Sequence, residues 1–247
     1  MCPDLTRYRR AVDWVLSLQN FEVERSTGED YHLDRVLAAL HAAGDPQDSV
    51  PSVHVAGTKG KGSVCAMTAS ILRASGQSVG LFTSPHLHTI RERIQVNGRP
   101  IARGAFADLA ALAERNATKA GTTLTTFEAL TLMAFLHFRA QRCMMNVIEV
   151  GLGGRLDATN VMSEPMCSAV ATIGLDRTEI LGTSITAIAR EKAGIAKRAR
   201  PFVVGPQSSP EAAPALVDEA TRRGATVIDT NALYSVDRLG QTLNGQA

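Results

Sequence analysis

Apolar positions in the first part of the chain repeat at helical spacing. Residues 5–19 carry a stripe that predicts a helix, and a second helix is predicted around 33–43, ending at Gly44. Short apolar runs then alternate with amphipathic stretches. The predicted strands are 52–56, 78–83, 145–150, 168–173, 201–204 and 225–228, and the predicted helices are 62–75, 104–119, 127–142, 184–196 and 210–223. This alternation favours an α/β fold, a mostly parallel sheet flanked by helices on both faces.

Two segments depart from the alternation. Between 90 and 101, the apolar Ile94 and Val96 precede an Asn97-Gly98 turn, which predicts a small hairpin. Residues 239–247 are polar and contain glycines, so we expect the fold to stop there without a final packed element.

Composition narrows the class of protein. A chain of 247 residues can build one large α/β domain, or one domain and a fragment of a second. Its net charge of +2 gives no case for a nucleic-acid partner. The four cysteines are scattered without a C-x-x-C pair, which is typical of cytosolic thiols. Without a signal-peptide core or a run of roughly 20 apolar residues, we expect a cytoplasmic protein and no membrane partner.

A glycine-rich turn follows the first predicted strand. It reads Gly57-Thr58-Lys59-Gly60-Lys61-Gly62-Ser63 and leads into a predicted helix. Amides that the glycines leave free, together with the positive end of that helix, form a cradle for a polyphosphate. Lys61 can reach the outer phosphates and Ser63 can approach a magnesium ion. The spacing departs from the strict phosphate-loop form because Gly62 precedes Ser63, but the strand–turn–helix context predicts an ATP-binding enzyme.

Two polar side chains follow later strands. Ligands of open α/β sheets bind at the carboxyl ends of the strands, so the loops there are where a site is expected. Ser84 comes directly before Pro85, either as a ligand-facing hydroxyl or as part of a plain loop. Glu149 ends an apolar run, where an unpaired carboxylate is costly to bury. Mg²⁺ would supply the missing partner, and an ion pair with Lys61 or an arginine is the alternative.

Three further segments have a structural and a functional interpretation. Gly151, Gly153 and Gly154 permit close approach of a ligand or of another loop. Lys192 lies one turn before the helix end that Gly194 marks, where the helix dipole favours a cation without any function. Residues 125–128 open a helix, and capping by threonine explains most of that pattern.

Taken together, these segments resemble folylpolyglutamate synthase and the bifunctional dihydrofolate synthase of the Mur ligase superfamily. The matching segments, in order along residues 28–204, are Leu33-Asp34-Arg35-Val36, the phosphate loop, Ser84-Pro85-His86-Leu87, Glu92-Arg93-Ile94, Phe127-Glu128, 149–160 and 190–195. The resemblance implies a P-loop NTPase-like central domain of the Mur ligase type. It also implies an ATP-dependent acid–amino acid ligase, which phosphorylates a folate or dihydropteroate carboxylate and lets the amino group of L-glutamate displace the phosphate.

The resemblance also implies a role for particular residues. The nucleotide-binding residues would be Thr58, Lys59, Gly60, Lys61, Gly62 and Ser63, and the Mg²⁺ ligands Ser84 and Glu149, with Ser63 close by. The catalytic residues would be Lys61, Glu149 and Lys192, and Lys192 matches a lysine that family members carry as a carbamate. The pterin-bearing substrate would lie against Asp30, Tyr31, Thr125, Thr126, Phe127, Glu128, Leu156, Asp157 and Ala158. The expected partners are small molecules, namely ATP, folate or dihydropteroate, and L-glutamate.

Three features depart from the family pattern. Arg177 stands where the family has a metal-ligating histidine; it either supplies a fixed positive charge beside the phosphates or marks a lost second metal site. Lys59 stands where the family has asparagine, which adds a charge near the phosphates. The chain is also shorter than family members.

We therefore expect residues 1–247 to form a single ATP-binding domain that is incomplete at its C-terminal end, without the C-terminal ligase domain. Whether a separate chain supplies that domain is left open by the sequence. The alternative function is a truncated, non-catalytic paralogue that binds nucleotide or folate only. A P-loop kinase or GTPase is disfavoured because no guanine-reading N-K-x-D pattern occurs.

Overall fold

The computed structural model describes residues 3–21, 30–234, 241–242 and 245–246. Its strands are β1 Ser52–Ala56, β2 Val79–Phe82, β3 Ile94–Val96, β4 Arg99–Pro100, β5 Met145–Glu149, β6 Cys167–Val170, β7 Pro201–Val204, β8 Thr226–Asp229, β9 Gln241–Thr242 and β10 Gly245–Gln246. Its α-helices are α1 Pro3–Ser17, α2 Asp34–Ala42, α3 Lys61–Ala74, α4 Arg103–Lys119, α5 Thr126–Ala140, α6 Thr178–Leu181, α7 Ile185–Ala193, α8 Ala212–Arg222 and α9 Thr230–Leu233, with 3₁₀ turns η2 Pro46–Asp48 and η3 Ile90–Arg93.

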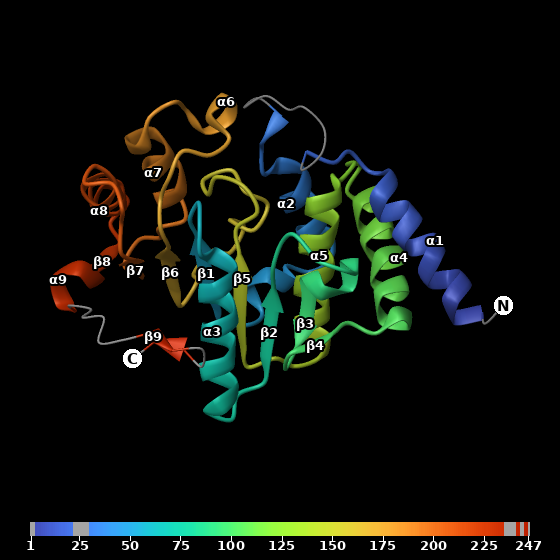
Figure 1. Ribbon diagram of the computed structural model, residues 1–247. Coiled ribbons are helices and arrows are strands. Elements are labelled where there is room, and N and C mark those ends of the chain that lie inside the picture. The colour runs from blue at the N-terminus through green and yellow to red at the C-terminus, as the bar shows by residue number, and fades with distance from the viewer. Residues whose placement is uncertain (1–2, 22–29, 235–240, 243–244, 247) are drawn as a thin grey trace.

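One large sheet organises the molecule (Figure 1). Its strand order is β4-β3-β2-β5-β1-β6-β7-β8, and the strands from β2 to β8 in this order are parallel. β3 and β4 form the predicted hairpin and pair antiparallel. Its turn residues Asn97 and Gly98 both have positive φ, as a tight two-residue hairpin requires. The predicted α/β class with a mostly parallel sheet is confirmed.

Helices cover the two faces of this sheet unequally. Val55, Leu81 and Val147 point to one face and pack on the buried side of α3, which crosses in front of the strands in Figure 1. The neighbouring positions Phe82 and Ile148 point to the opposite face and join the large core formed with α2, α4 and α5. Farther along that face, α7 and α8 pack over β6 and β7. Strands that are buried on both faces consist of continuous apolar runs, and for this reason they could be predicted from the sequence.

The structure differs from the predicted elements in a few places. The predicted strand 168–173 ends at Val170, because the next residues leave the sheet to contact other loops. The short helices α6 and α9 and the two 3₁₀ turns were not predicted, since one turn is too short to show a hydrophobic period. Part of segment 239–247 lies outside the described residues; its described parts form the small antiparallel pair β9–β10. Within the described part of the chain, no helix is long and apolar enough to cross a membrane.

Candidate functional site

The glycine-rich turn lies at the carboxyl end of β1, near the middle of the sheet, and leads into α3. Gly60 has φ +83 and is the N-cap residue of α3, so it needs the conformational freedom of glycine. Gly57 has φ +147, and a Cβ atom there would lie 3.0 Å from the Cβ of Ala171. Both glycines therefore fit a tight turn that presents the start of α3 to the edge of the sheet.

Two amides of this turn already have partners. The amides of Thr58 and Lys59 both donate to the Thr172 carbonyl, at 2.9 and 3.1 Å. The Thr58 hydroxyl donates to the Gly174 carbonyl at 3.0 Å. The resemblance implies phosphate contacts from the amides of residues 58–63, and these hydrogen bonds leave the amides of 60–63 at the start of α3 for that role. The backbone of Thr58 and Lys59 also ties the turn to the loop after β6.

Glu149 lies beside the start of α3. It is 4% exposed, and Oε2 accepts a hydrogen bond from the Ser84 amide at 3.1 Å. A Cβ atom on Gly62 would lie 3.7 Å from Oε2 and 3.9 Å from Oε1, so the carboxylate faces the phosphate turn. Burial raises the pKa of Glu149, while the Ser84 amide and the Lys61 charge oppose that rise. The structure thus brings Ser84, Glu149 and Lys61 to one edge, as predicted.

The donor set at Glu149 fits a hard cation. Among the described residues Glu149 forms no ion pair, so the alternative of an ion pair with Lys61 or an arginine is not observed. The described residues contain no group of three or more His, Cys, Asp or Glu side chains that could hold a metal. A Mg²⁺ ion here would need hydroxyl and phosphate oxygens besides the carboxylate, which is the way this ion is usually bound next to nucleotides.

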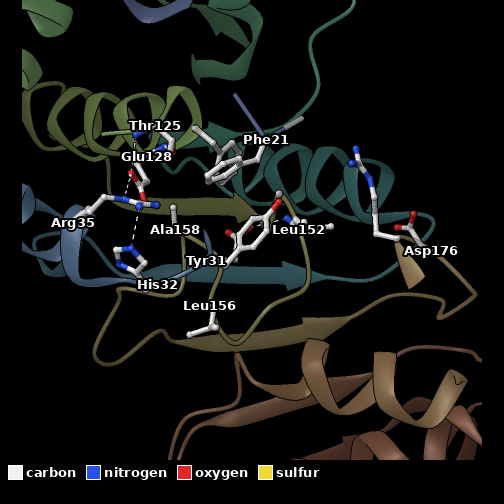
Figure 2. A pocket seen from close by; sticks show the side chains of 14 residues that line it. Phe21, Tyr31, His32, Arg35, Thr125, Glu128, Leu152, Leu156, Ala158 and Asp176 are labelled. Carbon is white, nitrogen blue, oxygen red and sulfur yellow. Dashed lines mark hydrogen bonds and ion pairs between the residues drawn. The ribbon is translucent and has the colours of Figure 1, made fainter. Parts of the chain in front are cut away.

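A cavity of about 240 Å³ opens next to this edge, and Figure 2 shows side chains that line it. Tyr31 lies in the middle of the view, Arg35 and Glu128 at one end and Asp176 at the other. Its lining residues are Phe21, Tyr31, His32, Arg35, Thr125, Phe127, Glu128, Gly151, Leu152, Leu156, Asp157, Ala158, Asp176 and Arg177. Aromatic walls with a few fixed polar groups suit a flat ligand that also forms hydrogen bonds.

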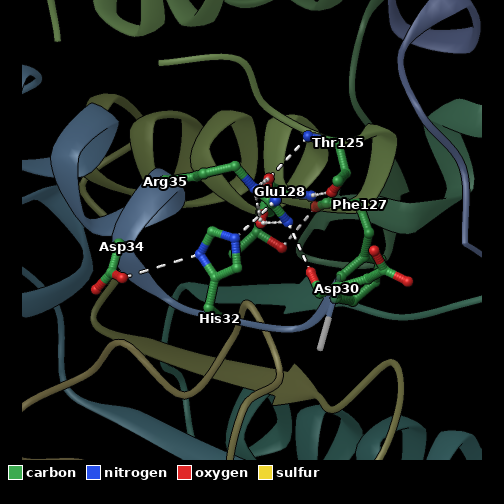
Figure 3. Close-up of polar contacts among 8 residues, drawn as sticks. Asp30, His32, Asp34, Arg35, Thr125, Phe127 and Glu128 are labelled. Carbon is green, nitrogen blue, oxygen red and sulfur yellow. Dashed lines mark hydrogen bonds and ion pairs between the residues drawn. The ribbon is translucent and has the colours of Figure 1, made fainter. Parts of the chain in front are cut away.

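Arg35 organises one end of the cavity (Figure 3). Its Nε and Nη2 atoms donate to the Glu128 carboxylate at 3.1 to 3.3 Å. It also donates to the Asp30 carbonyl, and its Nη1 lies 2.9 Å from His32 Nε2. Because a guanidinium can only donate, His32 Nε2 is the acceptor. Glu128 in turn accepts from the Thr125 amide at 2.8 Å, closing the capping box that begins α5. The predicted capping role of Thr125 is confirmed.

Asp157 lines the cavity and is 4% exposed. Its Oδ2 accepts from the Leu152 amide at 2.7 Å, and its Oδ1 accepts from the Thr159 amide at 3.0 Å and the Thr159 hydroxyl at 2.5 Å. Burial raises the pKa of Asp157, and these hydrogen bonds oppose the rise. The carboxylate is thus engaged by its own loop.

Most of the predicted substrate-binding residues line the cavity, and two do not. The Thr126 hydroxyl donates to the carbonyls of Val15 and Leu18, which holds α1 rather than a ligand. Asp30 is next to the cavity and contacts it through its carbonyl oxygen, which accepts from Arg35. Sequence reasoning missed Phe21, His32, Arg35, Leu152 and Asp176. Arg35 stands within a segment that carried the resemblance, but nothing local to that segment shows that it faces Glu128.

Lys192 is buried and not at a solvated helix end. Its side chain is 2% exposed in the last turn of α7. Burial first, and then repulsion from Lys61, lowers the pKa of Lys192 to about 8. The helix dipole alone does not account for this lysine, because burial disfavours its charged form and the pKa is lowered despite the dipole.

The glycines after β5 bring other parts of the chain together. A Cβ atom on Gly154 would lie 2.8 Å from the Lys192 carbonyl oxygen, and one on Gly151 would lie 2.5 Å from the Phe127 ring. The structure thus shows the close approach of neighbouring chain segments at Gly151 and Gly154, and Gly151 also lines the cavity. This packing places the loop after β5 between α5 and α7.

Known proteins share this sequence and fold, although no protein-family model matches the chain. The folylpolyglutamate synthase of Lacticaseibacillus casei is 38% identical over 209 residues, which cover 83% of this chain and 48% of that protein. The dihydrofolate synthase/folylpolyglutamate synthase of Mycobacterium tuberculosis is 37% identical over 234 residues, covering 88% and 48%. A solved FPGS–AMPPCP–folate complex superposes with a TM-score of 0.81 at 36% identity, covering 90% of this chain and 53% of that one.

The chain spans about half the length of the relatives that it matches. By sequence and by fold, most of this chain is homologous to folylpolyglutamate synthases and dihydrofolate synthases, over about half of their length.

Proposed function

We propose that this chain carries the ATP-binding and folate-binding part of a ligase that joins L-glutamate to the carboxylate of folate or dihydropteroate. One observation carries the proposal: β5 ends at Glu149, beside the phosphate turn, and the loop that follows continues through Leu156 and Ala158 in the wall of the cavity. One loop thus joins a nucleotide-type site to a site for a flat ligand. The solved relative that binds an ATP analogue and folate together supports the same pairing.

The proposed reaction runs in two steps. A carboxylate oxygen of the substrate attacks the γ-phosphorus of ATP, ADP leaves, and an acyl phosphate forms. The glutamate nitrogen then attacks the acyl carbon, phosphate leaves, and the nitrogen loses a proton. Phosphoryl transfer depends on positioning and charge neutralisation more than on covalent help from the protein.

The residues of this chain would hold the reactants for that chemistry. Lys61 and the amides of 60–63 would hold the phosphates, because the start of α3 presents unpaired donors and a positive dipole. Glu149 and Ser84, with Ser63 close by, would hold Mg²⁺. When bound, Mg²⁺ offsets the charge that builds up on the transferring phosphoryl oxygens.

Lys192 would act beside this site as a carbamate. A carbamate forms only from the neutral amine, and the lowered pKa of about 8 makes that form accessible near neutral pH. Carbamylation would also replace an expensive buried cation by an anion that faces the metal.

A second candidate is binding of nucleotide or folate without ligation, and Arg177 favours it. Arg177 lines the cavity with a left-handed φ of 45° and precedes α6. A guanidinium has no lone pair for a metal, so a second metal ion cannot be ligated at this position. Loss of such an ion would leave binding intact and slow the transfer.

Calorimetry tests the nucleotide part of the proposal. We expect the purified chain to bind AMPPCP with Mg²⁺, more weakly without Mg²⁺, and not measurably after Lys61→Ala. The control is Lys119→Ala, at the exposed end of α4, which should bind like the wild type. A folded wild-type chain that binds no AMPPCP would overturn the ligase, and one that also binds no folate would overturn both candidate functions.

Turnover then separates the two candidates. Incorporation of labelled glutamate is measured with dihydropteroate and with folate, each in the presence of ATP and Mg²⁺. Product from either substrate supports the ligase and shows which carboxylate it uses. Binding of AMPPCP and folate without any product would favour the non-catalytic alternative, and product that appears only after addition of a second polypeptide would identify a partner that completes the enzyme.

A further inference from the structure

A network of hydrogen-bonded side chains connects the wall of the cavity to β1. It begins at Asp157, whose two oxygens hold the Leu152 amide and both donors of Thr159. It continues to His54, whose Nε2 lies 2.8 Å from the Thr159 hydroxyl oxygen. His54 stands in the middle of β1, three residues before Gly57 of the phosphate turn.

The direction of each hydrogen bond in this chain is determined by its partners. The Asp157 carboxylate can only accept, so the Thr159 hydroxyl donates its proton to Oδ1. The Thr159 oxygen must then accept from His54, which places the imidazole proton on Nε2. His54 is 0% exposed, and its Nδ1 has no hydrogen-bond partner among the residues that the structure describes. Burial, aided by the nearby Lys197 charge, lowers the pKa of His54 to about 3, so the ring is neutral.

We propose that His54 is a positioning residue for the substrate cavity, acting through Thr159 and Asp157 on the loop of residues 151–158. His54 orients the Thr159 hydroxyl, and that hydroxyl orients Asp157. Asp157 then holds the amide of Leu152, whose side chain lines the cavity together with Leu156 and Ala158. The proposal rests on the proposed function, because it concerns the site for folate or dihydropteroate.

The position of this hydrogen-bonded network within the fold supports a role in shaping the cavity and not in the reaction itself. Neither His54 nor Thr159 lines the cavity, and Thr159 is 0% exposed. The loop that they hold has Phe127 on one side and the end of α7 on the other, so its backbone position sets the width of the cavity. A buried network in which each hydrogen bond has one possible direction favours a single geometry. Removing one side chain leaves the donors and acceptors of its neighbours without partners.

The test removes one hydroxyl with little change in volume. Thr159→Val should weaken folate binding by about tenfold, the effect of losing one buried hydrogen bond, while AMPPCP affinity changes less than about twofold. Thr159→Ser keeps the hydroxyl and should restore folate affinity. His54→Leu should weaken folate binding by a similar factor. The double variant should bind folate as tightly as the single variant with the lower affinity, because both substitutions break the same hydrogen-bonded network. Thr118→Val, on the exposed surface of α4, is the matched control.

A second measurement does not require folate. Hydrogen exchange at the Leu152 amide should become faster in Thr159→Val and in His54→Leu, and should be unchanged in Thr159→Ser. Continued protection of that amide in the first two variants would overturn the proposal, as would folate binding equal to that of the wild type. An equal loss of folate and AMPPCP affinity would also overturn it, since that result indicates general destabilisation. A wild-type chain that binds no folate but shows the expected exchange pattern would refute the substrate class and leave the loop-positioning role standing.

Discussion

At the scale of single residues, the burial of Lys192 has a direct consequence for stability. In the folded chain its pKa is lowered to about 8, and in the unfolded chain it returns to 10.5. Between these values the unfolded state binds more protons, so the contribution of Lys192 to the free energy of unfolding rises as pH rises from about 8 to about 10.5. Below pH 8 both states are protonated and the burial cost is fully present.

We predict that Lys192→Met is more stable than the wild type at pH 7 in CO₂-free buffer, and that this advantage shrinks as pH increases through 8 to 10. Urea unfolding at several pH values measures the difference, with Lys119→Met as an exposed control. If the difference in the free energy of unfolding between the two proteins does not change with pH, Lys192 is not a titrating ammonium. A carbamate that survives purification would give that result.

The pair Arg35–Glu128 provides a second residue-scale prediction. The Glu128 side chain is 6% exposed and that of Arg35 23%, so removing one partner leaves a poorly solvated charge. We expect Glu128→Ala to lower the free energy of unfolding by about 3 kcal/mol, at the lower end for breaking a buried pair because Arg35 keeps some access to water. Glu164→Ala, which breaks the exposed pair with Arg200, should cost less than about 1 kcal/mol. Equal losses in the two variants, measured by urea unfolding, would contradict this account.

At the scale of elements, the loop after β5 depends on its contact with α7. A Cβ atom on Gly154 would lie within 2.9 Å of backbone atoms of Glu191 and Lys192, which cannot move aside as a flexible side chain can. We predict that Gly154→Ala lowers the free energy of unfolding by about 1–3 kcal/mol, as overpacking does. The control is Gly174→Ala, whose nearest neighbour would be a Thr58 methyl at 3.7 Å. Chemical denaturation measures the free energy of unfolding of both variants. An unchanged value for Gly154→Ala would show that the backbone of α7 can move to accommodate the added methyl group.

The elements could be predicted from the sequence where their pattern is long or their burial is two-sided. β1 and β7 have the predicted bounds, and α5 begins at the capping box that its threonines indicated. The cavity could be predicted only in part, because its walls come from segments far apart in sequence. Arg35 and Glu128 are 93 residues apart and meet only when α2 packs on α5. Neither periodicity nor composition reveals that contact. The local sequence around Phe21, His32 and Arg35 therefore does not indicate that these residues line the cavity.

At the scale of the whole molecule, the position of β1 links stability to function. β1 lies between β5 and β6, inside a sheet whose order runs from β4 to β8. It carries both His54 and the phosphate turn, while Glu149 ends the neighbouring β5. The candidate site therefore stands on strands that are paired on both sides, where opening requires the largest part of the structure to unfold.

This arrangement predicts a gradient of hydrogen exchange across the sheet. The amides of β1 and β5 should exchange slowest, at rates set by global unfolding, and those of β8 and of the β3–β4 hairpin should exchange faster through local opening. AMPPCP with Mg²⁺ should slow exchange at residues 60–63 and, by stabilising only the folded state, also in β1 and β5. The Lys61→Ala variant should keep the gradient and lose the response to the nucleotide. Uniform exchange across all strands would instead mean that the sheet unfolds as a single cooperative unit, and the central position of β1 would then give the site no added protection.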